Sequence, residues 1–208
     1  MSPNVNYMTL EDCLTKLAGD LGADANLLRV YAAEDTIGGA GDYWSSSSIS
    51  ANEGKLVYAV IRYLYPEYVV EVGAWNGCSA SNILAALKMN DFGHLVSIDL
   101  NPLGRPGIVS GLSNRWTFIQ GNAEICNWNV PRVDLLLEDS EHTERSTRIC
   151  VQRGLDLKAG FVFSHDAMNA ESGARVRKGL DAALPRYTIL NLEDSQRGFA
   201  YWYKGMKA

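Results

Sequence analysis

The 208-residue sequence has few cysteines, no recognisable secretory signal and no long apolar run. Its four cysteines, Cys13, Cys78, Cys126 and Cys150, are scattered and form no C-x-x-C pair. This spacing excludes a zinc site built from cysteines and argues against a disulfide scaffold, so we expect reduced thiols and a cytoplasmic location. No segment approaches the roughly 18 consecutive apolar residues that a membrane-spanning helix needs.

Basic residues are also fewer than acidic ones. Nineteen basic and twenty-four acidic side chains give a formal net charge of −5, and no basic cluster interrupts that balance. We therefore expect neither a nucleic-acid partner nor a membrane partner. With 47% hydrophobic and 21% charged residues, the composition is that of a globular protein with one ordinary core.

Apolar, β-branched segments alternate with helical patterns from about residue 55 onward. Strands are expected at 68–72, 94–99, 115–119, 133–138 and 160–164, and helices at 79–88, 143–157 and 172–183. Such alternation is typical of a parallel sheet with helices on both faces. Segments 187–192 and 199–205 flank a turn-like EDSQRG and predict a hairpin. The expected fold class is α/β: a doubly wound, Rossmann-like sheet of seven strands, five parallel and then a C-terminal antiparallel hairpin.

The amino-terminal part has a different character. Two short helical patterns, at 8–18 and 24–33, precede the Gly- and Ser-rich IGGAGDYWSSSS. We expect residues 1–48 to form a helical cap or lid, with Tyr43 and Trp44 as candidates to cover the site, and residues 49–208 to form the main domain. The motif Ser50-Ala51-Asn52-Glu53 is a capping box that predicts the start of a helix ending before Pro66.

The most informative stretch is VEVGAWNGCS, at 70–79, which predicts a strand, a glycine turn and a helix start. Glycines permit a sharp turn and a close ligand, and amides at the helix start can hold an anion. A dinucleotide would require G-x-G-x-x-G, but Trp75 stands at the second glycine position and would obstruct a diphosphate. This argues against an NAD-dependent dehydrogenase. The actual E-x-G-x-x-x-G spacing suits S-adenosylmethionine, whose anionic group is one carboxylate.

Two later strand ends support this interpretation. Asp99 closes the second expected strand, where its carboxylate can accept hydrogen bonds from both ribose hydroxyls. Gly121-Asn122-Ala123 follows the third expected strand. A glycine turn alone is common in α/β proteins without a cofactor, and these two additions favour a cofactor site.

Acidic residues and histidines follow the next two strands, in EDSEH at 138–142 and SHD at 164–166. Because neighbouring parallel strands lie about 5 Å apart, Asp139, His165 and Asp166 are expected to converge. Clustered acids repel one another unless a cation or a proton relieves them. Two carboxylates and an imidazole suit Mg²⁺, Mn²⁺ or Fe²⁺ better than structural zinc. Alternatively, His165 supports the site from behind and water fills its position.

His142 lies three residues after Asp139, so that both side chains can point into one cavity. An imidazole is well suited to accept a proton at neutral pH. The plainer interpretations are that His142 is a surface or capping residue and that Asp166 merely caps the following helix. Two of the three histidines fall at these strand ends, which favours a functional site.

The segments quoted above, together with ISANEGKLVYAVIRYL, FIQGNAE, VDLLLED and GFVFSHDA, resemble the class I S-adenosylmethionine-dependent methyltransferases. More narrowly, they are similar to the metal-dependent small-molecule O-methyltransferases of the catechol, caffeoyl-CoA and bacterial macrolide- and aminocoumarin-sugar types. The resemblance covers roughly residues 48–205. One departure is the run Asp139-Ser140-Glu141-His142-Thr143, which lacks the glycine and the tyrosine usual in the family.

The resemblance implies methyl transfer to a hydroxyl of a small molecule, in secondary metabolism, with S-adenosylmethionine and a divalent metal, foremost Mg²⁺, as cofactors. It implies Asp139, His165 and Asp166 as metal ligands, and His142 as the general base beside a catalytic Asp139. The implied cofactor-binding residues are Glu71, Gly73, Ala74, Trp75, Gly77, Ser79, Asp99, Asn122 and Ala123. Because related enzymes often pair, a homodimer is also expected.

Two alternatives stay open. One is a metal-independent N- or O-methyltransferase, and activity that survives chelation would favour it. The other is a non-catalytic protein of the same fold that keeps the cofactor pocket, which single-turnover assays after replacement of Asp139 or His142 would reveal.

Overall fold

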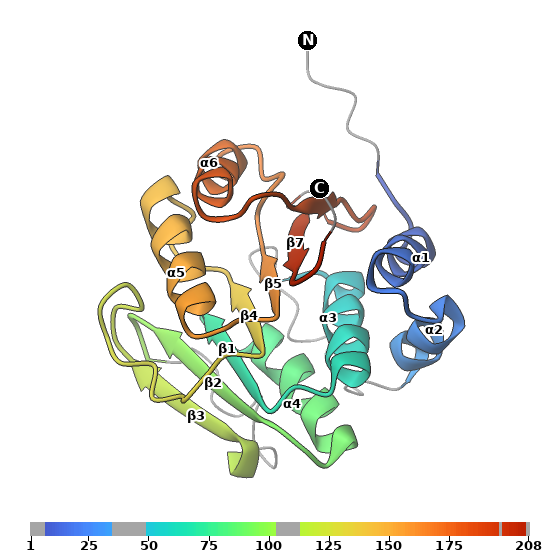
Figure 1. The fold of residues 1–208 in the computed structure, drawn as a ribbon, viewed down its shortest axis with the longest axis horizontal. Coiled ribbons are helices and arrows are strands. Elements are labelled where there is room, and N and C mark those ends of the chain that lie inside the picture. Colours follow the sequence, from blue (N-terminus) through green and yellow to red (C-terminus); the bar gives the residue numbers. More distant parts are fainter. Residues whose placement is uncertain (1–6, 35–48, 103–112, 196, 207–208) are drawn as a thin grey trace.

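The computed structural model describes residues 7–34, 49–102, 113–195 and 197–206. They form a seven-stranded sheet in the order β3-β2-β1-β4-β5-β7-β6 (Figure 1). The strands are β1 (Tyr68–Val72), β2 (His94–Asp99), β3 (Trp116–Gln120), β4 (Leu135–Glu138), β5 (Phe161–Ser164), β6 (Thr188–Leu190) and β7 (Phe199–Tyr203). The first five pair in parallel, and β7 is antiparallel to both β5 and β6. The predicted fold class is confirmed.

Helices cover both faces of this sheet. They are α1 (Leu10–Leu21), α2 (Ala25–Ala33), α3 (Ala51–Leu64), α4 (Cys78–Asn90), α5 (Glu144–Asp156) and α6 (Gly173–Ala183), with a 3₁₀ turn, η3 (Ser113–Arg115). Because successive strand residues point to opposite faces, β4 contributes to two cores. Leu135 and Leu137 pack with α1 to α4, whereas Leu136 packs with α5 and α6. None of the helices in the described ranges is long and apolar enough to cross a membrane.

The amino-terminal helices share the core of the sheet. Leu14 and Leu17 of α1 and Leu28 of α2 belong to the same buried cluster as Leu56 of α3. A parallel bridge between Met8 and Leu192 ties the chain ahead of α1 to the strand region. The predicted lid residues Tyr43 and Trp44 lie outside the described residues, and the division at residue 48 stays a prediction.

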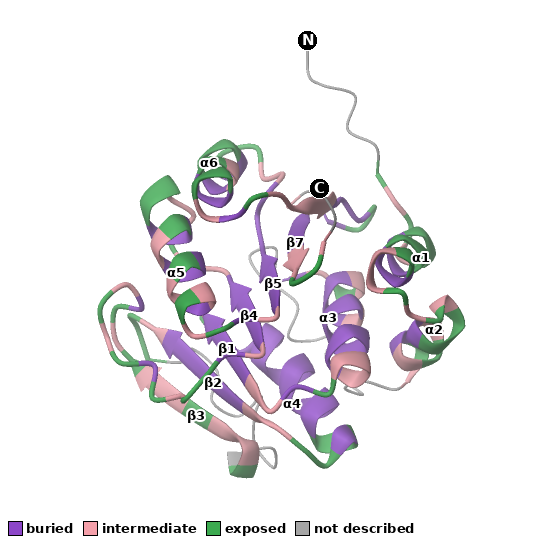
Figure 2. Cartoon of the chain, in the orientation of Figure 1, coloured by how far each residue is buried: buried purple, intermediate pink, exposed green. Residues whose placement is uncertain are grey.

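The start of α3 follows the predicted capping box. The Ser50 hydroxyl accepts a hydrogen bond from the Glu53 amide (3.1 Å), and the Glu53 carboxylate accepts one from the Ser50 amide (2.7 Å). The next helix, α4, begins directly after the glycine turn, and eleven of its thirteen residues are buried (Figure 2). Its sequence, CSASNILAALKMN, carries small or apolar residues on most sides, as expected of a helix enclosed by protein.

The contact between α5 and α6 depends on a glycine. A Cβ at Gly179 would lie 2.7 Å from the carbonyl oxygen of Glu144 and 2.8 Å from the Cβ of Thr147. We therefore expect Gly179→Ala to lower the free energy of unfolding by about 1–3 kcal/mol, measured by urea denaturation. The matched control is Gly19→Ala in α1, where a Cβ meets nothing within 4 Å. It should raise stability by up to about 1 kcal/mol. Equal effects of the two substitutions would contradict the close packing of α5 on α6.

Candidate active site

A cavity of about 360 Å³ lies at the carboxyl ends of the parallel strands. Its wall includes residues that follow four strands in turn: Ala74 after β1, Asp99 at the end of β2, Asn122 after β3 and Asp139 after β4. The strand order reverses between β1 and β4, the place where open α/β sheets bind ligands.

The turn after β1 lies directly against the end of β4. Gly73 has a φ of 89°, and a Cβ there would lie 1.9 Å from the carbonyl oxygen of Asp139. Only glycine fits this position, because any side chain would occupy the space of the neighbouring backbone. Gly77, with a φ of 85°, is the N-cap of α4. The two glycines that the sequence singled out are therefore required by the backbone itself.

Seven of the nine predicted cofactor-binding residues line the cavity: Gly73, Ala74, Trp75, Ser79, Asp99, Asn122 and Ala123. The other two, Glu71 and Gly77, are buried behind that lining. Trp75 is half exposed at the wall. All nine residues therefore lie in or directly behind the wall of one cavity, and their roles in cofactor binding stay predictions.

Asp99 connects two of the turns around the cavity. One carboxylate oxygen accepts a hydrogen bond from the Trp75 amide, and the other accepts one from the Asn101 amide, both at 2.9 Å. The side chain is thereby held in one orientation at the cavity wall, between the glycine turn and the loop after β2.

Glu71 is a fully buried acid at the end of β1. The hydroxyls of Ser79 and Ser97 both donate hydrogen bonds to its carboxylate, the latter at 2.5 Å. Burial raises the pKa of Glu71 to about 7, and the negative charges of Asp139 and Asp99 add to the rise, while the two hydroxyl donors oppose it.

This pKa predicts a pH-dependent stability. Because the folded protein binds the Glu71 proton more tightly than the unfolded chain does, the stabilisation is complete below pH 4.5 and is lost as the pH rises through about 7. Between pH 5 and pH 8 the parent should lose up to about 3 kcal/mol of unfolding free energy that Glu71→Gln retains. Urea denaturation of protein without added cofactor measures the difference. The control, Glu67→Gln, replaces a partly exposed carboxylate that pairs with Arg132 and should follow the parent. Parallel curves for parent and Glu71→Gln would reject the assignment.

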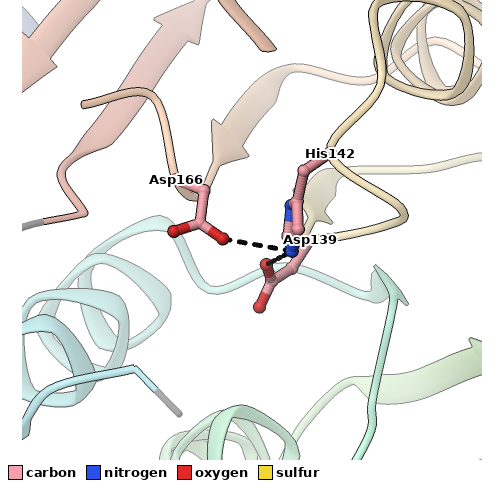
Figure 3. Close-up of side chains that lie close together, drawn as sticks. All are labelled: Asp139, His142 and Asp166. Carbon is pink, nitrogen blue, oxygen red and sulfur yellow. Dashed lines mark ion pairs between the residues drawn. The ribbon is translucent and has the colours of Figure 1, made fainter. Parts of the chain in front are cut away.

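The strand-end residues form a second group at the same edge. Ligand-capable atoms of Asp139, His142 and Asp166 lie within 4.8 Å of one another, and Figure 3 shows the three side chains turned toward one point. His142 Nε2 is 3.1 Å from Asp166 Oδ2 and 3.8 Å from Asp139 Oδ1. His142 and Asp166 have left-handed backbones, with φ of 54° and 59°. Such strained residues collect at functional sites.

His165 lies behind this group, with its side chain 1% exposed. Its Nδ1 is 3.1 Å from Asp139 Oδ1, and its Nε2 is 3.3 Å from Glu53 Oε2. Burial alone would lower the pKa of His165, but the carboxylates of Asp139 and Glu53 outweigh it and hold the pKa well above its usual value. The imidazolium in turn lowers the pKa of both carboxyl groups against the effect of their burial. Both ring nitrogens therefore face carboxylates.

Two charged residues of this region, Glu53 and Arg197, were not predicted from the sequence. Glu53 was expected only as a helix cap, yet it contacts His165. Arg197, from the loop before β7, lines the cavity, and its guanidinium lies 3.8 Å from Asp166 Oδ1. A glutamate is almost never fully buried without a partner, but its burial is not visible in the sequence. No local motif marks Arg197.

Comparison with known proteins identifies the region around the cavity. Residues 70–167 match the family model of a methyltransferase domain. The chain is similar to a caffeoyl-CoA O-methyltransferase from Mesembryanthemum crystallinum, with 28% identity over 104 residues that cover 48% of this chain and 38% of that protein. A caffeoyl-CoA O-methyltransferase from Petunia hybrida is 26% identical over 104 residues. The match spans about two fifths of the length of these curated relatives.

Several solved structures resemble nearly the whole chain in fold. Cofactor-bound Rv0187 from MTB has a TM-score of 0.64 at 17% identity, covering 94% of this chain and 97% of that one. An O-methyltransferase from Bacillus cereus, solved with SAH, has a TM-score of 0.59 at 14% identity and covers 92% and 97%. TomG from Streptomyces achromogenes, solved with SAM, has a TM-score of 0.58 at 14% identity and covers 96% and 91%. The predicted resemblance to class I S-adenosylmethionine-dependent O-methyltransferases is confirmed.

Proposed function

We propose that the protein is an S-adenosylmethionine-dependent O-methyltransferase that acts on a hydroxyl group of a small molecule, in secondary metabolism. One observation carries the proposal. The cavity is lined both by the glycine turn with Asp99 and by Asp139 with His142, which follow β4, the neighbour of β1 in the sheet. A site for the nucleoside of a cofactor and a site for an acid–base reaction therefore share one wall. A homodimer, a cytoplasmic location and the lack of nucleic-acid and membrane partners stay predictions.

The cavity wall offers a distinct group to each part of S-adenosylmethionine. We assign the ribose hydroxyls to the Asp99 carboxylate, which is already oriented by two backbone amides. Asn122 and Ala123 border the adenine. The glycine turn and Ser79, held from behind by Glu71, receive the amino-acid end. The side chain of Trp75 at the cavity wall supports this cofactor over a dinucleotide.

The strand-end group has a donor set that fits a divalent cation. Carboxylate oxygens of Asp139 and Asp166 are the ligands that Mg²⁺ and Mn²⁺ prefer, and an imidazole lies beside them. We assign the cation to Asp139 and Asp166. His165, expected from the sequence as a third ligand, turns both ring nitrogens toward carboxylates. We therefore favour the alternative in which His165 supports the site from behind and water fills its position.

When bound, S-adenosylmethionine supplies the methyl group, and the cation lowers the pKa of the acceptor hydroxyl. Methyl transfer is an in-line displacement, so the residues must align oxygen, carbon and sulfur. The acceptor oxygen would gain the methyl group and give its proton to the imidazole of His142, with S-adenosylhomocysteine as the other product. The Asp166 carboxylate, 3.1 Å from Nε2, accepts the hydrogen bond of that nitrogen, orients the ring and leaves Nδ1 as the basic nitrogen. Because one ring nitrogen donates to Asp166 and the other takes up the proton, His142 is not assigned as a ligand of the cation.

The function is tested by binding and by transfer of labelled methyl groups. Calorimetry should detect binding of S-adenosylhomocysteine to the protein and no binding of NAD. Label from S-adenosylmethionine should reach catechol or caffeoyl-CoA in the presence of Mg²⁺, stop on chelation with EDTA and return with added Mg²⁺. Binding of NAD and not of S-adenosylhomocysteine would rule out S-adenosylmethionine as the cofactor. Methyl transfer that survives chelation would rule out the cation and favour a metal-independent methyltransferase. Binding of S-adenosylhomocysteine without methyl transfer to any hydroxyl acceptor would favour a non-catalytic protein.

Removal of the Asp99 carboxylate should weaken cofactor binding. We expect Asp99→Ala to lower the affinity for S-adenosylhomocysteine by about 1.5–3 kcal/mol, because two ribose hydroxyls lose a charged acceptor. Calorimetry gives the value. Asp91→Ala removes an exposed aspartate paired with Arg115 away from the cavity lining and should leave the affinity unchanged. Equal affinities of parent and Asp99→Ala would take Asp99 out of the cofactor site.

Replacement of the proposed base should affect transfer and spare binding. We expect His142→Ala to lower the rate of methyl transfer by about 10²–10⁴-fold, with the affinities for S-adenosylhomocysteine and Mn²⁺ retained. His94→Ala is the matched control, since His94 begins β2 and contacts Thr117 rather than the cavity. A near-normal rate in His142→Ala would show that another group is the general base. Loss of Mn²⁺ binding in this variant would show that His142 is a ligand of the cation.

A further inference from the structure

A buried ion pair lies directly behind the strand-end residues. Glu53, in the first turn of α3, and His165, just after β5, have side chains that are 0% and 1% exposed. Their charged atoms are 3.3 Å apart, and the other ring nitrogen of His165 is 3.1 Å from the Asp139 carboxylate. The three residues thus form a continuous chain of polar contacts from a helix start to the cavity wall.

Burial at this position makes the charged forms of Glu53 and His165 energetically costly. The ring of Phe199 lies 4.9 Å from the ring of His165, centre to centre, and Glu53 is enclosed at the base of α3. An ion pair removed from water rarely stabilises a fold more than apolar side chains of the same size would. Stability alone therefore gives a weak reason for a histidine and a glutamate in this place.

Helix capping does not explain the pair either. A second carboxylate, that of Asp194, already serves the start of α3, since it accepts hydrogen bonds from the Ser50 hydroxyl and from the Asn52 amide, both at 3.0 Å. Asp194 is exposed, so that it performs this task without the cost of burial. Glu53 completes the capping box by accepting the hydrogen bond of the Ser50 amide, but that role does not require the contact with His165, which Asp194 lacks.

We propose that Glu53 and His165 are positioning residues that hold the Asp139 carboxylate toward the cavity. The Asp139 backbone is fixed by the hydrogen bond that its amide donates to the Val72 carbonyl (2.8 Å), and His165 then determines where the side chain points. Glu53 holds the opposite edge of the imidazole ring and prevents its rotation. The proposal rests on the proposed function, in which Asp139 binds a cation beside His142.

The test measures cation binding rather than turnover. The probe is Mn²⁺ on the full chain, with free Mn²⁺ followed by electron paramagnetic resonance. We expect Glu53→Gln, which keeps the size of the side chain and an acceptor for the Ser50 amide, to weaken Mn²⁺ binding by about 10–100-fold. Affinity for S-adenosylhomocysteine without metal should stay within about twofold. The matched control, Asp194→Asn, perturbs the same helix start without contacting His165 and should bind Mn²⁺ like the parent.

A second pair of variants separates positioning from packing. In His165→Asn the side-chain amide can still donate to Asp139, whereas His165→Ala loses the contact. The asparagine variant should recover part of the Mn²⁺ affinity that the alanine variant loses. Equal losses in these two variants, equal losses in Glu53→Gln and Asp194→Asn, or unchanged binding in Glu53→Gln would each overturn the proposal.

A parent protein that binds no Mn²⁺ would refute the proposed cation site and not the positioning role. A crystal structure of Glu53→Gln then decides the latter. The Asp139 carboxylate should leave its 3.1 Å contact with His165, and an unmoved carboxylate would overturn the inference.

Discussion

The contact between the glycine turn and the Asp139 backbone is the constraint on which the rest of the site depends. Since a Cβ at Gly73 would lie 1.9 Å from the Asp139 carbonyl oxygen, the end of β4 approaches the turn after β1 as closely as backbones allow. Hydrogen bonds from the Gly73 amide to Ile98 and from the Asp139 amide to Val72 fix both chains in this approach. The glycine turn and the acidic strand end consequently share one cavity.

The acidic residues gathered at one edge of the sheet would repel one another if all were ionised. Their surroundings reduce this repulsion in two ways. Glu71 and Glu138 are enclosed among hydroxyl donors, and burial raises the pKa of each. Asp139 and Glu53 instead face His165, whose positive charge lowers their pKa values. The pKa of Asp139, at the cavity wall, is thus lowered, whereas the pKa values of Glu71 and Glu138 are raised. This difference favours Asp139 as the carboxylate for the proposed cation.

Much of the fold and part of the site were predictable because the relevant physics is local. The apolar run 68–72, the glycine turn and the Ser50 capping box each determine their own geometry, and all three occur as predicted. The convergence of Asp139 and Asp166 followed from strand adjacency, which alternation of strands and helices implies. The partnership of Glu53 with His165 joins residues that are 112 positions apart, and nothing in either local sequence encodes it. Arg197 reaches the cavity only because β7 inserts beside β5.

Trp75 illustrates how one residue can satisfy several demands at once. Its left-handed backbone, with a φ of 38°, continues the turn that Gly73 begins, and its amide donates to Asp99. Its side chain stands half exposed at the position where a dinucleotide-binding turn requires glycine. The residue that argues against a diphosphate therefore also orients the carboxylate assigned to the ribose. Because the Asp99 contact is made by the Trp75 backbone, replacing the side chain would open space in the turn without releasing that carboxylate. The proposed cofactor preference and the proposed ribose contact thus depend on different atoms of one residue.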